Sequence, residues 1–154
     1  MKLSLDYSKS AKQIPPPGEA ILKFKSKAQK TTTKAPPRPM LEIQWNVSHM
    51  DGIAPDQYDR ATIYDNLMLT EDMLWKLRQL MAACNVECTC ASCGTNYSAD
   101  PNDGTSQGAC PNCGSFAFDV DLDFIDTAAP KVQLEEGQDQ QGRPVCRIKA
   151  YIKQ

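Results

Sequence analysis

This sequence lacks both long apolar runs and the common signatures of catalysis. No stretch approaches the roughly 20 apolar residues of a membrane span, and neither a lipidation motif nor an apolar signal segment is present. We therefore expect a soluble, cytoplasmic protein. A phosphate-binding loop of the Walker type and a Gly-x-Ser-x-Gly elbow are also missing. Histidine occurs once, at His49, and a lone histidine without a nucleophile or second ligand is more often an ordinary polar residue.

A run of aspartates is the one feature that points toward hydrolysis. Asp119, Asp121, Asp123 and Asp126 resemble the acids of a two-metal nuclease. The first three alternate with apolar residues and should share one face of a strand, where solvated charge explains them more simply. We therefore predict that the protein is not an enzyme.

The net charge of -2 hides an uneven distribution. Residues 1–45 hold nine Lys or Arg against three Asp or Glu, residues 46–130 hold three against thirteen, and residues 131–154 hold five against three. If the fold brings the two basic ends together, it forms a positive face on an acidic body, as expected of a nucleic-acid groove. Ordinary solvated lysine remains the alternative interpretation.

Four of the seven cysteines form two matching turns separated by sixteen residues: Cys90-x-x-Cys93-Gly94 and Cys110-Pro111-x-Cys113-Gly114. Each glycine accepts a backbone conformation that a side chain would obstruct, so each turn can aim two thiolates at one point. The separation falls within the zinc-ribbon pattern of about 15 to 20 residues. A closed set of four thiolates, Cys90, Cys93, Cys110 and Cys113, predicts one structural zinc ion and leaves no open position for catalysis.

Two other uses of these cysteines remain open. Disulfides need an oxidising compartment, whereas the chain has no signal segment and an odd number of cysteines. Iron uses similar turns, and ligation by four sulfurs does not exclude it. Cys88 lacks the two-residue gap and the following glycine that mark Cys90. We therefore interpret Cys84, Cys88 and Cys146 as reduced structural cysteines.

Hydrophobic periodicity predicts one domain of five strands and one helix. Alternation places strands at residues 20–27, 40–47 and 61–69, with Phe24 and Trp45 facing inward. A helix follows at 71–83, with Thr70 as its N-cap and Trp75 against the barrel. Val120, Leu122 and Phe124 alternate with aspartates as a fourth strand, and residues 126–142 form a polar loop. The last strand turns Cys146, Ile148, Ala150 and Ile152 inward.

This order predicts a mainly β fold: a five-stranded OB-fold Greek-key barrel with one helix after strand 3 and an inserted zinc ribbon. We divide the chain into a flexible N-terminal arm at 1–18, OB strands 1–3 and the helix at 19–85, the ribbon at 86–118, and OB strands 4–5 at 119–154.

Three runs carry a resemblance to a known family. They are Pro16-Pro17-Gly18-Glu19-Ala20, Pro39-Met40-Leu41-Glu42-Ile43, and Asp65-Asn66-Leu67-Met68-Leu69 leading into Trp75-Lys76-Leu77-Arg78. With the closing run 147–151, they resemble the phage family of small single-stranded DNA-binding proteins encoded among replication and recombination genes. The resemblance implies an OB-type fold, sequence-independent binding of single strands without catalysis, and a place in the cytoplasm of an infected bacterium. The cysteine ribbon departs from the family pattern, so its role is not carried over.

Single-strand binding needs basic groups that track phosphates and aromatics on which bases stack. Strand alternation and the loop after the first strand predict such groups on outward faces. The candidate DNA-binding residues are Lys23, Lys25, Lys27, Lys30, Lys34, Arg38, Tyr64, Arg147, Lys149 and Tyr151.

The alternative is a zinc-ribbon protein-protein adaptor of a replication or transcription complex. Its acidic middle could meet a basic partner. Phage or host replication and recombination proteins are possible partners under either interpretation. We expect neither a membrane nor a small-molecule substrate as a partner.

Overall fold

The computed structural model describes residues 1–7, 14–54, 57–58 and 61–153, so residues 8–13 of the predicted arm lie outside the described part. The protein is mainly β, as predicted. Within the described residues, no helix is long and apolar enough to cross a membrane.

The elements, in chain order, are β1 (Gly18–Thr31), β2 (Pro39–His49), β3 (Thr62–Met68), the 3-10 helix η1 (Glu71–Met73), α1 (Trp75–Ala83), β4 (Cys88–Cys90), β5 (Asn96–Tyr97), β6 (Phe118–Asp119), the 3-10 helix η2 (Leu122–Thr127), β7 (Lys131–Gln138) and β8 (Pro144–Tyr151).

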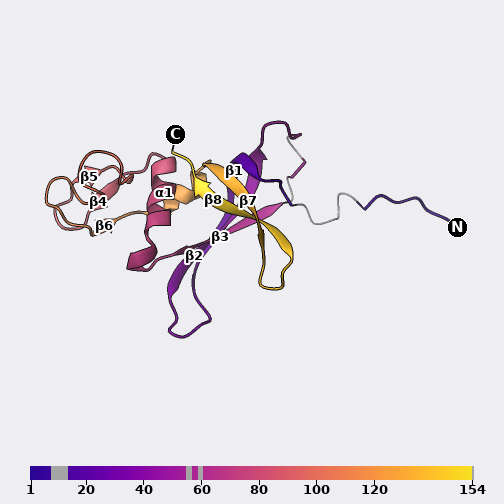
Figure 1. Cartoon of the computed structure of the whole chain (residues 1–154), viewed down its shortest axis with the longest axis horizontal. Helices are drawn as coiled ribbons and strands as arrows, with labels where there is room; N and C mark the ends of the chain where they lie inside the picture. The colour runs from indigo at the N-terminus through magenta and orange to yellow at the C-terminus, as the bar shows by residue number, and fades with distance from the viewer. Residues whose placement is uncertain (8–13, 55–56, 59–60, 154) are drawn as a thin grey trace.

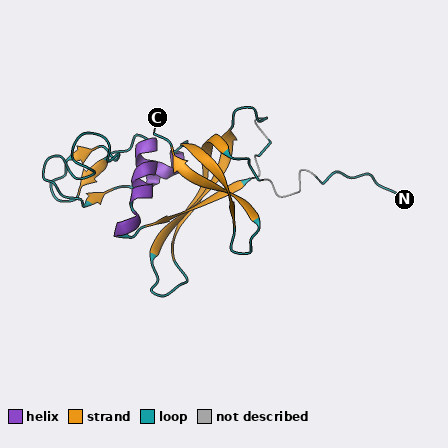
Figure 2. Ribbon diagram, viewed as in Figure 1, coloured by secondary structure: helices purple, strands orange, loops and turns teal. Residues whose placement is uncertain are grey.

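Two antiparallel sheets organise these elements. The larger sheet has the order β3-β2-β1-β7-β8, and the smaller has the order β5-β4-β6. Figure 1 shows α1 between the two sheets, with the small sheet at one end of the molecule and the N-terminus at the other. Figure 2 shows the long β1–β2 hairpin and the β7–β8 hairpin leaving the large sheet on the same side. The predicted barrel is not closed, because no backbone ladder joins β3 to β8 in the described residues.

The predicted first three strands and the last strand are confirmed to within a few residues, but the fourth is wrong. Residues 122–127 form η2 instead, because the Asp121 carboxylate accepts a hydrogen bond from the backbone N–H of Asp123 at 2.9 Å and turns the chain. The fourth strand of the large sheet is β7, in the segment predicted to be a polar loop. Only Val132 and Leu134 of β7 are buried, so its hydrophobic pattern is short.

The core lies between the large sheet and α1. Trp45 is fully buried, and the ring of Phe24 meets it edge-on with centroids 6.3 Å apart, so both aromatics face inward as predicted. Trp75 was predicted to pack against the barrel, and this is wrong because 56% of it is exposed. The largest fully buried side chains are Trp45, Leu22, Leu41, Ile43, Ile63, Leu67, Leu80, Met81, Ile125, Leu134 and Val132.

The end of α1 directs the chain into the small sheet. Asn85 adopts a left-handed conformation with φ of 56°. The backbone N–H of Val86 donates to the Met81 carbonyl at 2.9 Å, and that of Asn85 donates to the Ala82 carbonyl at 3.2 Å. These two bonds form a Schellman motif, which satisfies carbonyls at the helix end. Thr70, which directly precedes η1, was predicted to cap the helix. This prediction is wrong, since the Thr70 hydroxyl makes no cap hydrogen bond.

Candidate functional site

The two cysteine turns have the same backbone geometry. The N–H of Gly94 donates to the Cys90 carbonyl and that of Gly114 to the Cys110 carbonyl, each at 2.9 Å. Both glycines have φ of 77°, a left-handed conformation that side chains rarely adopt. The tight turns therefore depend on glycine directly after the second cysteine of each pair, as the sequence predicted.

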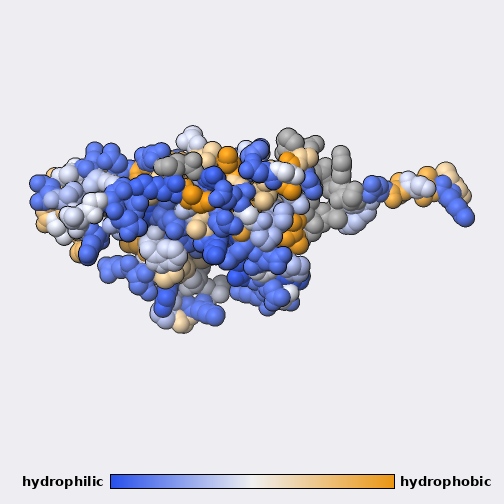
Figure 3. Space-filling view, turned by 45° about the horizontal axis from the view of Figure 1, so that its top comes forward, coloured by the Kyte–Doolittle hydropathy of each residue, from blue (hydrophilic) through white to orange (hydrophobic). Residues whose placement is uncertain are grey.

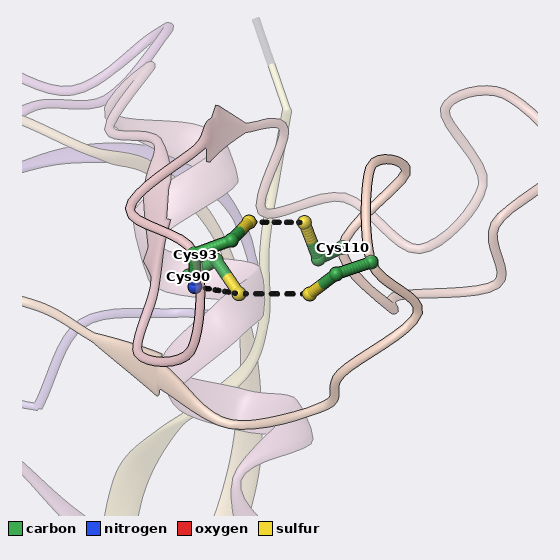
Figure 4. Close-up of side chains that lie close together, drawn as sticks. Cys90, Cys93 and Cys110 are labelled. Atoms are coloured by element: carbon green, nitrogen blue, oxygen red, sulfur yellow. Dashed lines mark hydrogen bonds between the residues drawn. The ribbon is translucent and has the colours of Figure 1, made fainter.

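These turns bring the four predicted ligands together. The sulfur atoms of Cys90, Cys93, Cys110 and Cys113 all lie within 4.8 Å of one another, with Cys90 and Cys113 separated by 3.5 Å and Cys93 and Cys110 by 3.6 Å. Figure 4 shows the labelled Cys90, Cys93 and Cys110 with their sulfurs converging between two loops. This cluster can hold a metal ion.

The electrostatics of the cluster also favour a cation. Hydrogen bonds from Thr95, then from Asn112, lower the pKa of the Cys93 thiol to about 5. At Cys113 a backbone hydrogen bond from Ser115 acts to lower the pKa, but the neighbouring cysteine sulfurs, Cys90 first, outweigh it and raise the pKa to about 12. Four thiolates cannot crowd together without a positive charge to balance them, and a metal ion supplies that charge.

Arg78 attaches the ribbon to α1. Its Nε donates to the Ala99 carbonyl at 3.0 Å, and its terminal nitrogens donate to the carbonyls of Gly108 and Ser98 at 3.2 and 3.4 Å. The guanidinium also stacks near two ribbon rings, Tyr97 and Phe118, at 5.6 and 5.0 Å from the ring centroids. One arginine therefore satisfies three ribbon carbonyls and packs on two rings.

Lys153, which follows β8, adds a second attachment. Its ammonium lies 3.0 Å from Asp100 and 2.8 Å from Asp103, both in the long loop between the cysteine turns. The ribbon is thus held to the rest of the chain by cations from α1 and from the segment after β8.

The three remaining cysteines stay apart from the cluster and carry free thiols. Burial raises the pKa of the Cys84 and Cys146 thiols to about 11, and burial also raises the pKa of the Cys88 thiol. All three are therefore protonated and unreactive near neutral pH.

A groove of about 750 Å³ lies along the open side of the large sheet, between β3 and β8. We call it the central groove. Tyr64 and Asn66 of β3 line one wall, Arg147 of β8 lines the other, and Lys76 of α1 also lines it. Other lining residues are Ile14, Pro15, Thr62, Asp65, Glu135, Asp139, Gln140, Val145, Cys146 and Ile148. Of the ten predicted DNA-binding residues, Tyr64 and Arg147 therefore meet in one groove.

The outward face of β1, β2 and β3 adjoins the central groove. Tyr64 is 57% exposed and stands opposite Gln44 of β2, which confirms its predicted outward orientation. Lys23 is exposed on β1 opposite Asn46. Lys25 is also exposed, and its ammonium donates to the Thr62 hydroxyl at 2.9 Å. These side chains form an exposed aromatic and basic surface.

Acidic neighbours already pair with two of the predicted lysines. Lys27 was predicted to face outward with Lys23 and Lys25, and this is wrong, because the register shift at Lys25 pairs it with the buried Ile43. Lys27 contacts Asp126 and lies 3.6 Å from Asp123, and these carboxylates, Asp126 first, raise its pKa. Lys30 lies 2.9 Å from Glu42. The other predicted cations, Lys34, Arg38 and Lys149, are exposed, the first two in the loop between β1 and β2.

Tyr151 was predicted to face outward for base stacking, and this is wrong. It is only 3% exposed. The ladder between β7 and β8 pairs Leu134 with Ile148 but Gln133 with Ala150, so Lys149 is an extra residue in β8. Such a bulge shifts the alternation by one residue. The residues after it change faces, and Tyr151 enters the core.

Tyr151 belongs to a buried polar network that spans the open side of the sheet. Its hydroxyl donates to Asp65 of β3 and accepts a hydrogen bond from Trp45 Nε1 at 3.2 Å. The ammonium of Lys76 lies 2.8 Å from the other Asp65 oxygen. Burial, and then the negative charge of Asp65, raise the pKa of Tyr151 well above its ordinary value. Side chains thus join β3 to β8 where the backbone does not.

Sequence reasoning missed three exposed aromatics, one of them Tyr7 near the N-terminus. Trp75 was assigned to packing, although it sits at the first residue of α1, where a side chain can leave the helix toward solvent. Phe116, which is 70% exposed, lies two residues after Gly114 in the ribbon. The strands of the ribbon are too short for the alternation of apolar and polar residues to predict which side chains are exposed.

Comparison with protein-family models and with curated proteins gives no match. The function is therefore argued from the residues and their geometry.

Proposed function

We propose that this protein binds single-stranded DNA, without sequence preference, in the central groove and on the adjoining face of β1–β3. The observation that carries the proposal is that Tyr64 and Arg147, from the two edge strands of the large sheet, line one groove. An exposed aromatic ring offers a stacking platform, and a guanidinium pairs with phosphate or stacks on a base.

The strand order supports this proposal. The order of three strands, one helix and two further strands, with the sheet order β3-β2-β1-β7-β8, is compatible with the OB fold that we propose. OB folds bind oligonucleotides on the face of strands 2 and 3 and on the loops at either side. Tyr64 lies on that face, and Lys34 and Arg38 lie in the loop between β1 and β2.

The central groove carries charges of both signs, so only its unpaired cations can contact the phosphates of single-stranded DNA. Lys76 is paired with Asp65 and Arg143 with Asp139, at 2.8 Å each. Arg147 donates to the Gln138 carbonyl and faces no carboxylate within ion-pair distance among the described residues. Arg147 is therefore a cation of the groove with charge to offer a phosphate. Lys23 and Lys25 on the adjoining face, and the exposed Lys34, Arg38 and Lys149, offer charge in the same way. DNA replication or recombination in a phage is the setting that the sequence resemblance supports.

The ribbon has a structural role in this proposal, with one zinc ion held by Cys90, Cys93, Cys110 and Cys113. Zinc–sulfur bonds of about 2.3 Å in a tetrahedron separate the sulfurs by about 3.8 Å, and the separations of 3.5 and 3.6 Å are close to this value. A bound zinc ion would neutralise the thiolates and fix the two turns. Iron ligated by four thiolates has a similar shape, and metal analysis of the purified protein distinguishes the two.

Fluorescence anisotropy with labelled single-stranded and double-stranded oligonucleotides of equal length tests the proposal. We expect preferential binding of the single strand, weakening as salt rises. Tyr64→Ala should weaken binding about tenfold, because stacking of one base contributes about 1 to 3 kcal/mol. Arg147→Ala should weaken it and reduce the slope of log affinity against log salt by about 0.7 if one phosphate contact is lost.

Two control variants remove similar groups elsewhere. Phe116→Ala removes an exposed aromatic from the ribbon, and Lys131→Ala removes a cation that is paired with Glu19 at 3.1 Å. Both should bind single strands as the wild type does. Equal effects of all four substitutions would contradict the assignment of the groove.

Exposed Phe116 is the observation that favours the adaptor alternative. An aromatic next to a rigid metal turn is a suitable anchor for a partner protein. Absence of binding to either oligonucleotide at low salt would reject single-strand binding and direct the search to partners of the ribbon.

A further inference from the structure

The N-terminal arm, residues 1–7, alternates between apolar and polar side chains. Met1, Leu3, Leu5 and Tyr7 share one side of an extended chain, and Lys2, Ser4 and Asp6 share the other. Leu3, Leu5 and Tyr7 are 69%, 86% and 74% exposed. Figure 3 shows hydrophobic and hydrophilic residues following one another along the arm, which extends away from the rest of the molecule in this view. The arm has the pattern of a strand that buries one face, and it buries none here.

A trough between the ribbon and η2 offers an apolar surface that could cover the apolar side of the arm. Its floor is apolar, formed by Val86, Val120 and Phe124, in a groove of about 560 Å³. The same Val86 and Phe124 also line an adjoining groove of about 330 Å³ beside the end of α1. The two grooves share these residues and therefore adjoin, and we call them together the acidic trough because of the carboxylates on the rim.

Three carboxylates form that rim. Thr89 of β4 stands opposite Asp119 of β6, so continuing the antiparallel register by two residues places Glu87 opposite Asp121. Like charges opposite one another destabilise neighbouring strands. Among the described residues, no lysine or arginine forms an ion pair with Glu87, Asp119 or Asp121. The trough therefore has uncompensated negative charge above an apolar floor.

We propose that the arm of one copy docks into the acidic trough of a second copy of this chain. The apolar side of the arm, Leu3 and Leu5, would cover Val120 and Phe124, and Lys2 would approach the rim. Within residues 1–7 Lys2 and Asp6 carry one charge of each sign, and Lys9 and Lys12 follow them in the sequence. An extended chain of seven residues spans about 23 Å.

The fold favours docking between copies over docking within one copy. Ile14 and Pro15 line the central groove beside β3 and β8. Figure 1 shows the N-terminus at the opposite end of the molecule from the ribbon. A contact between two different surfaces is head-to-tail, and such contacts extend into chains or rings of copies. An array of this kind would also suit a protein that covers a long ligand, but the contact itself requires no DNA.

Sedimentation velocity of the full-length, metal-loaded protein without DNA tests the proposal. The wild type should form assemblies that grow with protein concentration. Leu5→Asp should weaken association by about tenfold or more, because a buried leucine loses its apolar contact and gains a desolvated charge. Ser4→Lys is the control: it adds a charge one residue away, on the polar side that approaches the acidic rim, and should not weaken association.

A mixing experiment identifies the two surfaces. Leu5→Asp keeps an intact trough, and a second variant with Glu87→Lys and Asp119→Lys keeps an intact arm. Each alone should stay monomeric, and an equal mixture should form dimers and nothing larger, because only one complementary contact remains. Glu136→Lys, at an exposed acid of β7, should assemble as the wild type does.

Three results would overturn the proposal. They are a wild type that is monomeric at every concentration, a Leu5→Asp variant that assembles as strongly as Ser4→Lys, or a mixture of the two defective variants that stays monomeric. Circular dichroism and metal content of each variant verify that it has folded. Because no nucleic acid is present, failure here leaves single-strand binding to its own test.

Discussion

Tyr64 and Tyr151, which the sequence predicted as candidate platforms for base stacking, should respond differently to the loss of a hydroxyl. In Tyr151→Phe the buried network loses two hydrogen bonds: the one that Tyr151 donates to Asp65 and the one it accepts from Trp45 Nε1. Removal of one partner leaves the other buried and unsatisfied, which is the costly case.

The magnitude follows from these two bonds. A hydrogen bond to a charged group contributes about 1.5 to 3 kcal/mol and a neutral one about 0.5 to 1.5 kcal/mol, so we expect Tyr151→Phe to lower the free energy of unfolding by about 3 kcal/mol. For a chain of this length each kcal/mol shifts the melting temperature by about 2 to 4 °C, which gives a fall of about 6 to 12 °C. Asp65 keeps its ion pair with Lys76, so the fold should survive.

The pH dependence gives an independent check. A tyrosine in the unfolded chain ionises near pH 10, whereas burial and Asp65 raise the pKa of Tyr151 in the folded protein. Above about pH 10 the unfolded chain loses this proton while the folded protein keeps it, so the free energy of unfolding falls as pH rises. Phenylalanine has no such proton, and the stability difference between wild type and Tyr151→Phe should shrink above that pH.

Urea denaturation followed by circular dichroism measures both effects, and Tyr64→Phe is the matched control. Tyr64 is exposed, so removing its hydroxyl should change stability by less than about 0.5 kcal/mol. If Tyr151→Phe is as stable as the wild type and instead loses affinity for single strands, then Tyr151 faces solvent and the bulge at Lys149 is wrong.

Three further predictions concern the metal cluster, the attachment of the ribbon to α1, and Thr70 before η1. Cys110→Ser should remove the bound metal while Cys88→Ser keeps it, as measured by elemental analysis of the purified proteins. Arg78→Ala should accelerate hydrogen exchange of ribbon amides and leave the large sheet unchanged, because three ribbon carbonyls lose their donor; equal acceleration in both sheets would contradict this. Thr70→Val should raise the free energy of unfolding by up to about 1 kcal/mol, since the Thr70 hydroxyl is buried without a partner; a loss of 1 kcal/mol or more would show that the hydroxyl is satisfied.

The sequence was most informative where a pattern has a single local cause. The cysteine turns were predictable because glycine at a fixed position permits the turn, and the turn fixes where the thiols point. β2 and β3 were predictable because their inward residues alternate without interruption over a buried core, as Leu41, Ile43 and Trp45 do in β2. β1 was predictable from Ala20, Leu22 and Phe24, although its pairing with β2 shifts register at Lys25.

Other features depend on contacts that periodicity does not record. The aspartates near Asp121 alternate like a strand, but one of them bonds to the backbone and starts a 3-10 helix. The bulge at Lys149 depends on pairing with β7, so no pattern within β8 reveals that Tyr151 turns inward. The attachment of the ribbon by Arg78 joins residues some 20 to 30 positions apart in the chain.

A titration of single-stranded and double-stranded oligonucleotides of equal length, at several salt concentrations, tests single-strand binding most directly when wild type, Tyr64→Ala and Tyr151→Phe are compared. We expect salt-sensitive preference for the single strand, an affinity about tenfold lower in Tyr64→Ala, and unchanged affinity in Tyr151→Phe below its unfolding temperature. Equal binding of both oligonucleotides, or an affinity that Tyr64→Ala leaves unchanged, would contradict single-strand binding in the central groove.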